Sequence, residues 1–252
     1  MKKFTFLIPV FNDWDSLNIL LERIDQEISS FEDIFDIVVL NDGSTIKHSI
    51  KNKKFKKINL IKILNLKKNL GSQRALAIGL KYLSIFEKET NIILMDADGE
   101  DDPNLLKKII DSSKRFPNKI ITANRTKRNE NLIFRFMYEI HYLFTLLITG
   151  KKVRFGNYSL INSNKLKKIL SSGDLWGAYP AAIVNNYNDI EPLFSERKKR
   201  NTGKTKMNLF KLIFFLSEFF EYTNETSEIP ISVNFSIIHS ILLKLFVGAI
   251  TR

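Results

Sequence analysis

A short run in the middle of the chain places a buried strand, a cluster of carboxylates and a helix start in immediate succession. Residues 93–103 read Ile-Leu-Met-Asp-Ala-Asp-Gly-Glu-Asp-Asp-Pro. The apolar beginning is typical of a buried strand, and Pro103 fits a first helical position capped by Asp102. The run therefore predicts a β-strand followed directly by an α-helix, the repeating unit of α/β sheets.

The same run carries the strongest indication of chemistry in the chain. Because strand side chains alternate between faces, we expect Asp96 and Asp98 on one side and Ala97 on the other. Closely packed carboxylates repel one another unless a positive charge lies among them, and a divalent cation with oxygen ligands is the usual solution. The run predicts a metal and diphosphate site, although a solvated acidic turn with a helix cap explains the motif when it is taken alone.

The first half of the chain repeats the alternation of strand and helix. Expected strands cover residues 4–10, 37–40, 59–64, 92–95 and 120–123, and expected helices cover 17–28, 72–86 and 103–116. The first of these helices is expected to follow a cap at Asp15 or Ser16. This order predicts an α/β fold with a mostly parallel central sheet, right-handed crossovers and helices on both faces.

In such sheets, ligands bind beyond the carboxyl ends of the strands. Here those ends carry residues 9–13, Asp42, and Asp96 with Asp98. Three strand ends that bear turn formers and acids favour a binding site over an isolated acidic turn. From Leu132 onward the alternation fades and the sequence becomes aromatic-rich and irregular, which we interpret as the acceptor side of one domain.

Composition excludes several classes of protein. The chain has 252 residues, of which 44% are hydrophobic, enough for a full-sized core, and it has no cysteine. Disulfide frameworks, thiolate metal sites and cysteine nucleophiles are therefore excluded. The formal charge of +12 predicts attraction to phosphates of nucleotides, nucleic acid or anionic lipids. No recognised nucleic-acid-binding module accompanies the charge, so we expect no nucleic-acid partner.

No stretch reaches the ~20 uninterrupted apolar residues of a membrane-spanning helix. The nearest candidates are residues 132–148, 209–220 and 235–250, each interrupted by charged residues or histidine. All three suit a membrane interface as well as a protein core. We expect a cytoplasmic protein, with peripheral attachment to the inner face of an anionic membrane as the alternative.

Seven short motifs follow one another along the chain. They are Ile8-Pro9-Val10-Phe11-Asn12-Asp13, Asn41-Asp42-Gly43-Ser44-Thr45, Asn69-Leu70-Gly71 with Gln73-Arg74-Ala75, Asp96-Ala97-Asp98, Asn124-Arg125, Gly156-Asn157-Tyr158-Ser159-Leu160, and Arg197-x-x-Arg200-x-x-Gly203-x-Thr205. Together they resemble the inverting family 2 glycosyltransferases of the GT-A fold, especially the branch with dolichyl-phosphate mannose synthase and bacterial polyprenyl-phosphate glycosyltransferases. Each is short, but their order and spacing are specific. The resemblance covers most of the chain.

The resemblance implies roles for individual residues. The implied nucleotide-binding residues are Pro9, Phe11, Asp13, Asp42, Asp96 and Ala97. Asp96 and Asp98 are the implied ligands of Mg²⁺ or Mn²⁺, and Asp98 is also counted as catalytic. Glu100 is a third expected ligand, at a position where the family often has glutamine, and it adds a negative charge.

The acceptor side is less fully specified. A hydroxyl acceptor needs a general base, for which Asp101 and Asp174 are the candidates, whereas a phosphate acceptor is already ionised and needs cations instead. Because arginine forks suit phosphate geometry, we assign Arg125, Arg197 and Arg200 to that role. We expect a GT-A domain over residues 1–225, with a nucleotide-binding half at 1–125 and an acceptor half at 126–225. Residues 226–252 are expected to form a strand and an apolar helix.

The sequence thus predicts a metal-dependent inverting glycosyltransferase. Its expected partners are a UDP- or GDP-sugar donor and a polyprenyl-phosphate or related cell-envelope acceptor. One alternative is transfer to a sugar hydroxyl in surface polysaccharide or glycolipid assembly. The other is a nucleotide-binding module without turnover.

Overall fold

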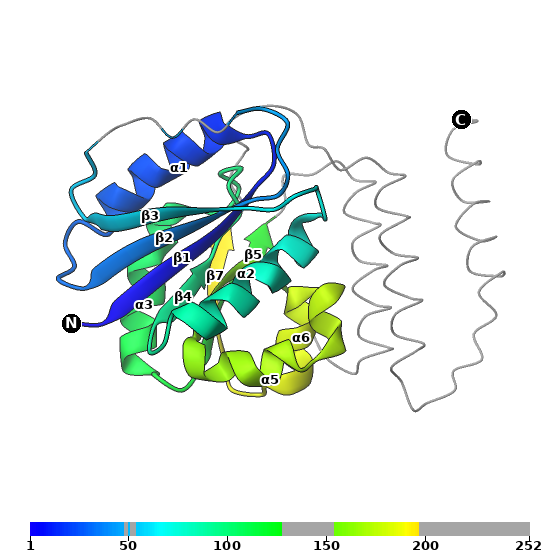
Figure 1. The fold of residues 1–252 in the computed structure, drawn as a ribbon. Helices are drawn as coiled ribbons and strands as arrows, with labels where there is room; N and C mark the ends of the chain where they lie inside the picture. Colours follow the sequence, from blue (N-terminus) through cyan, green and yellow to red (C-terminus); the bar gives the residue numbers. More distant parts are fainter. Residues whose placement is uncertain (48–49, 51–53, 128–153, 197–252) are drawn as a thin grey trace, which may run out of the picture.

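A seven-stranded sheet forms the centre of the molecule, in the order β3-β2-β1-β4-β6-β5-β7 (Figure 1). The computed structural model describes residues 1–47, 50, 54–127 and 154–196, with the side chains of 125–127 and 195–196 left aside. The strands are β1 (Lys3–Val10), β2 (Ile34–Asn41), β3 (Ile58–Asn65), β4 (Asn91–Leu94), β5 (Ile120–Lys127), β6 (Phe155–Asn162) and β7 (Ile190–Glu196). The longer helices are α1 (Trp14–Glu27), α2 (Ser72–Phe86), α3 (Leu106–Arg115), α5 (Leu166–Leu170) and α6 (Tyr179–Asn186).

β1 has a parallel neighbour on each side. It pairs with β2 from Lys3 to Val10 and with β4 from Phe4 to Leu7. The chain runs from β1 through β2 to β3 on one side, then crosses over to β4 on the other side. The gap between the ends of β1 and β4 is therefore the point at which the strand order reverses, where open α/β sheets bind ligands.

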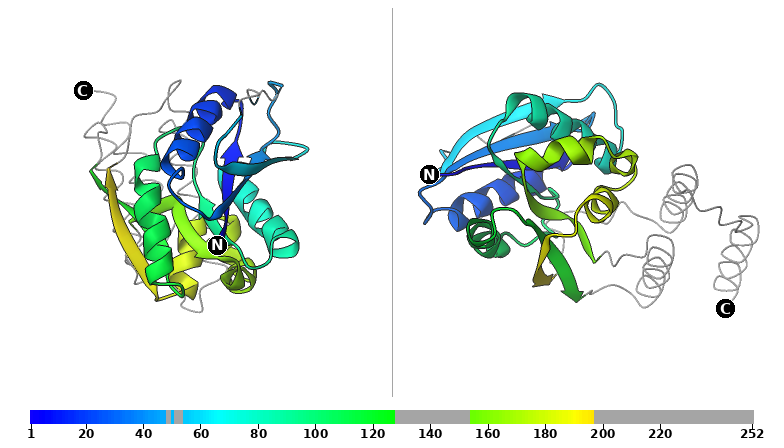
Figure 2. Two further views of the ribbon diagram at one scale, coloured as in Figure 1. Left: turned by 90° about the vertical axis from the view of Figure 1, so that its left-hand side faces the viewer. Right: turned by 90° about the horizontal axis from the view of Figure 1, so that it is seen from below.

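Helices cover both faces of the sheet (Figure 2). Alternate side chains of β1 divide between two apolar clusters: Phe4, Phe6 and Ile8 pack with α1 and α3, whereas Leu7 packs with α2, α5 and α6. This division follows from the two-residue period of a strand, because both faces of a central parallel strand are buried. The predicted α/β fold with helices on both faces of a mostly parallel sheet is confirmed.

Most predicted element boundaries in the first half lie within three residues of the observed ones, with two informative differences. α1 begins at Trp14, so Asp13 rather than Asp15 or Ser16 occupies the cap position, and its side chain makes no capping hydrogen bond. The helix predicted for 103–116 divides into a 3₁₀ turn (η1, Pro103–Leu105) and α3. Asp102 caps η1 as predicted, since its side chain accepts from Asn104 N–H.

No helix or strand was predicted for residues 154–196, yet they form two strands of the sheet and two helices. β6 lies between β4 and β5 and runs antiparallel to both. Two 3₁₀ turns, η2 (Ser163–Lys165) and η3 (Gly173–Trp176), accompany α5 and α6 in this part. The strand was missed because it buries Asn157 and Ser159, which break the apolar pattern that marks a core strand.

Asp25, near the end of α1, fixes the start of β3. Its carboxylate accepts hydrogen bonds from the backbone N–H groups of Lys56, Lys57 and Ile58 at 2.8–3.0 Å. Burial opposes ionisation of Asp25, but these three donors outweigh it and lower the pKa below the ordinary value of 3.8. One side chain therefore ties the first helix to the edge strand of the sheet.

We expect Asp25→Asn to lower the free energy of unfolding by about 1–3 kcal/mol at pH 7, because an amide can accept with only one atom. The folded-state pKa of Asp25 is lowered, so its contribution is present above the unfolded pKa and is lost as pH falls through the folded value. Urea unfolding should show the difference from wild type shrinking below about pH 4. Asp111→Asn, at an exposed position of α3, is the control, and an equal loss there would contradict this role.

Candidate active site

The loop after β1 is tied to the loop after β2 by Asn12. Its side-chain oxygen accepts from the backbone N–H groups of Thr45 and Ile46 at 2.9 and 3.0 Å, and its own N–H donates to Ser44 Oγ at 3.0 Å. Asn12 has a φ of 53°, a conformation that asparagine tolerates better than most residues. Phe11 and Asp13, two of the predicted nucleotide-binding residues, flank Asn12 in the sequence and are half-buried.

Pro9 marks where β1 and β4 separate. Proline has no N–H to contribute to a ladder, and the pairing of β1 with β4 ends at Leu7 and Leu94. Pairing with β2 continues through Pro9 to Val10. Pro9 is buried, and beyond it β4 leaves the sheet to form the acidic turn. The proline therefore suits an opening between two parallel strand ends without the loss of a ladder hydrogen bond to β2.

Asp42 holds the loop that precedes α2. Its carboxylate is 3% exposed and accepts from the backbone N–H groups of Leu70 and Gly71 at 2.8 and 3.0 Å. The next residue, Gly43, has a φ of 65°, and a Cβ there would lie 2.4 Å from the carbonyl carbon of Lys68. Asp42 thus has a structural role in this loop. The contact with the nucleotide base that the family resemblance implies stays a prediction.

The acidic run after β4 folds into a compact turn with Gly99 at a φ of 81°. Asp101 is 4% exposed and accepts from the backbone N–H of Asp96 at 3.0 Å, while Asp98 Oδ1 accepts from the N–H of Glu100 at 3.0 Å. Ala97 is buried in the apolar cluster of α1 and α3, whereas Asp96 and Asp98 on either side of it are half-buried. The expected contrast between Ala97 and its acidic neighbours is present, but the acids lie in a turn after Leu94 rather than in the strand.

The neighbouring strand β6 contributes directly to this turn. Asn157 Nδ2 donates to Asp96 Oδ1 at 3.0 Å, and Tyr158 OH donates to the carbonyl oxygen of Asp102 at 3.2 Å. Burial raises the pKa of Tyr158 well above its ordinary range, and the negative charges of Asp101 and Asp102 add to this effect. Tyr158 is therefore a neutral hydrogen-bond donor beneath the acids.

The donor set suits a hard cation that is shared with a substrate. The described residues contain no group of three histidine, cysteine or acidic side chains arranged to hold a metal alone. Mg²⁺ commonly takes only one or two protein carboxylates together with phosphate oxygens and water. The half-buried Asp96 and Asp98 fit that arrangement. Glu100 stays a predicted ligand.

The predicted cationic residues of the acceptor side fall at or beyond the edge of the described structure. Arg125 belongs to β5 and is in register with Ser195 of β7, although its side chain is not described. Arg197 and Arg200 lie outside the described residues, as do the apolar segments 132–148, 209–220 and 235–250. In the part that is described, no helix combines the length and apolar character required to cross a membrane.

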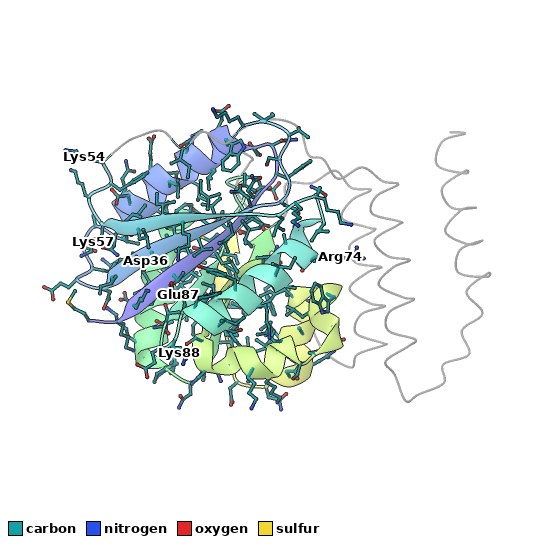
Figure 3. The ribbon with its side chains drawn as sticks, viewed as in Figure 1. Asp36, Lys54, Lys57, Arg74, Glu87 and Lys88 are labelled. Atoms are coloured by element: carbon teal, nitrogen blue, oxygen red, sulfur yellow. The ribbon has the colours of Figure 1, made fainter. Side chains whose placement is uncertain are left out.

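A separate hollow of about 820 Å³ lies at the amino end of the sheet. Its lining includes Lys3, Glu87, Asn91 and Asn162. Lys3 Nζ forms ion pairs there with the carboxylates of Asp36 and Glu87, at 3.0 and 2.5 Å. Figure 3 shows Glu87 and Arg74 at opposite ends of α2, with Arg74 at the end that begins after Gly71. We place the candidate site at the acidic turn rather than at this hollow, because that edge of the sheet carries the carboxylates and the loops that follow β1, β2 and β4.

Sequence reasoning missed three residues that organise the site. Asn12 was given no role, although it lies between the predicted nucleotide-binding residues Phe11 and Asp13. Asparagine at a turn often hydrogen-bonds the backbone, so the residue type itself is a signal. Gln73 and Asn157 were noted only as parts of motifs. Gln73 Nε2 donates to Asn157 Oδ1 at 3.1 Å, which connects the start of α2 to β6. No local pattern reveals such a contact between residues 84 positions apart.

The mostly parallel sheet, the reversal point beside Pro9 and the acidic turn after β4 agree with the GT-A fold of nucleotide-sugar transferases that the motif resemblance implies. The chain belongs to glycosyl transferase family 2, whose sequence profile matches residues 5–176. The resemblance drawn from the motifs is thereby confirmed.

Individual relatives are similar over most of this chain. An uncharacterized glycosyltransferase of Synechocystis sp. is 26% identical over 216 residues, covering 82% of this chain and 65% of the relative. The dodecaprenyl-phosphate galacturonate synthase of Rhizobium johnstonii is 23% identical over 186 residues, covering 71% of this chain and 54% of the relative. The chain thus spans between about half and two thirds of the length of these relatives.

A solved structure supports the fold. The glucosyl-3-phosphoglycerate synthase of Mycobacterium tuberculosis, in complex with Mn²⁺, UDP-glucose and phosphoglyceric acid, superposes with a TM-score of 0.64 at 11% identity. The match covers 92% of this chain and 82% of that one. At this identity the likeness establishes the GT-A architecture alone.

We expect Gly43→Ala to cost roughly 2–4 kcal/mol of stability. The added methyl group would meet the backbone of Lys68 and Asn69, and the alanine would have to adopt a positive φ. Gly71→Ala is the matched control: its φ is 86° but nothing lies within 4 Å of the added Cβ. It should cost about 1–3 kcal/mol, because its φ of 86° and ψ of 154° lie in a backbone region that is nearly confined to glycine. Urea unfolding of both variants measures the difference, and a smaller loss at Gly43 than at Gly71 would rule out close contact at Gly43.

Proposed function

We propose that this protein is a metal-dependent inverting glycosyltransferase that moves a sugar from a UDP- or GDP-sugar to a polyprenyl phosphate or a related cell-envelope acceptor. The observation that carries the proposal is the meeting of three loops at one sheet edge. These are the Asn12 loop after β1, the Asp42 loop after β2 and the acidic turn after β4. Membership of glycosyl transferase family 2 supports the activity.

The donor half of the proposal assigns tasks to described residues. Asp96 and Asp98 would bind a divalent cation, which when present neutralises charge on the diphosphate leaving group. Pro9, Phe11, Asp13 and Ala97 would border the nucleoside, and Asp42 would fix the loop beside it. The Mn²⁺ and UDP-glucose in the solved neighbour are consistent with this assignment, although they belong to that protein.

A phosphate acceptor is favoured over a hydroxyl because both candidate bases have other partners. Asp101 accepts from Asp96 N–H inside the turn, and Asp174 accepts from Ser172 Oγ and Asn185 Nδ2 at 2.9 and 3.0 Å. An ionised phosphate needs no base, but it does need cations, for which Arg125, Arg197 and Arg200 remain our candidates. The similarity to a relative named dodecaprenyl-phosphate galacturonate synthase supports the same choice.

Binding of UDP or GDP is expected to require Mn²⁺ or Mg²⁺, and Asp98→Asn should weaken it at least about tenfold, since even partners of metal ligands change affinity by about 10–100-fold. Asparagine retains an oxygen for Glu100 N–H, so the turn should survive. Calorimetry with and without Mn²⁺ measures this, with Asp111→Asn as the control. Binding that is indifferent to metal and to Asp98→Asn would contradict the metal assignment.

The product of transfer should be a glycosyl phosphate, which mild acid hydrolyses. Incubation with radiolabelled UDP-sugars or GDP-sugars and a short polyprenyl phosphate, followed by mild acid, tests this outcome. An acid-stable glycoside formed from a sugar acceptor would instead establish the hydroxyl alternative. Metal-dependent nucleotide binding without any transfer would favour a module that lacks turnover.

A further inference from the structure

A line of three hydrogen bonds joins the start of α6 to Asp96. The backbone N–H of Tyr179 donates to Gln73 Oε1 at 2.9 Å, Gln73 Nε2 donates to Asn157 Oδ1 at 3.1 Å, and Asn157 Nδ2 donates to Asp96 Oδ1 at 3.0 Å. The line connects α6, α2, β6 and the acidic turn. It therefore links two parts of the chain that the sequence assigned to the acceptor and the donor.

The two ends of the line fix its direction. A backbone N–H can only donate and an ionised carboxylate can only accept, so each amide between them has one orientation that satisfies both neighbours. Turning either amide over would place one oxygen against another and one N–H donor against another. Because the bonds all point the same way, each one polarises the next toward Asp96.

The surroundings make these bonds costly to break. Asn157 is 7% exposed and Tyr179 is fully buried. The Tyr179 hydroxyl bonds Ser159 Oγ at 2.8 Å, so the first residue of α6 is held through both its backbone and its side chain. Leaving a buried amide without a partner costs the protein more stability than its hydrogen bond contributes when it is formed.

We propose that Gln73 and Asn157 are positioning residues that orient the Asp96 carboxylate for the divalent cation. Asn157 engages Asp96 Oδ1, which fixes the rotation of the carboxylate, and Gln73 acts only through Asn157. Groups that hydrogen-bond a metal ligand commonly set its orientation and basicity in this way. This inference rests on the proposed function, since it concerns the same metal site.

The test is the affinity for Mn²⁺ in the presence of the nucleoside diphosphate that wild type binds, measured by calorimetry on the full chain. Gln73→Met and Asn157→Ala should each weaken Mn²⁺ binding roughly tenfold. The double variant should lose no more than Asn157→Ala alone, because Gln73 has no second route to Asp96. Gln73→Glu is a milder variant that keeps the acceptor for Tyr179 N–H but lacks the donor for Asn157, so it should resemble Gln73→Met.

Thr5→Val is the matched control, because it removes a buried hydrogen bond between Thr5 and Thr90 at the start of β1, where neither residue contacts the line to Asp96. It should lower Tm yet leave Mn²⁺ affinity within about twofold. The inference fails if the Gln73 variants bind Mn²⁺ as wild type does, if Thr5→Val loses as much Mn²⁺ affinity as they do, or if the losses at Gln73 and Asn157 add. A wild-type protein that binds no nucleoside diphosphate with Mn²⁺ would overturn the proposed function, and this inference with it.

Discussion

The pairing of β1 with parallel strands on both sides is the constraint on which the rest of the structure depends. Since β2 and β4 both run parallel to β1, the loops that follow all three strands emerge at one edge. Asn12, Asp42 and Asp96, which are far apart in the sequence, are neighbours only because of that arrangement. The apolar side chains of β1 keep it there, as they fill the clusters on both faces of the sheet.

Side-chain to backbone hydrogen bonds then give these loops a fixed shape. Asn12 holds the turn after β2, Asp42 holds the turn before α2, and Asp101 closes the acidic turn on itself. Each of these side chains satisfies backbone groups that would otherwise be unpaired near a buried edge. The site is thus organised by its own polar residues, which reduces the conformational entropy that the loops would lose on binding a substrate.

The sequence predicted features that depend on local pattern and left out those that depend on distant pairs. The strand before Asp96, the cap at Asp102 and the extent of α2 follow from apolar periodicity, proline chemistry and glycine placement. β6 was not predicted, because Asn157 and Ser159 interrupt its apolar face, and their hydrogen bonds to α2, α6 and the acidic turn join residues far apart in the sequence. The start of α1 was misplaced because Trp14 is buried as the first helical residue, a tertiary contact that outweighs the preference for a serine cap.

The contact between Gln73 and α6 uses the backbone N–H of Tyr179, so any residue except proline at this position carries the donor that the contact needs. Pro180 is the second residue of α6, where a missing N–H costs the helix nothing. A proline one position earlier would be equally acceptable to the helix but would leave Gln73 without its donor. Helix formation and the line of hydrogen bonds to Asp96 therefore place different limits on the same two residues, and the stricter limit comes from a carboxylate three hydrogen bonds away.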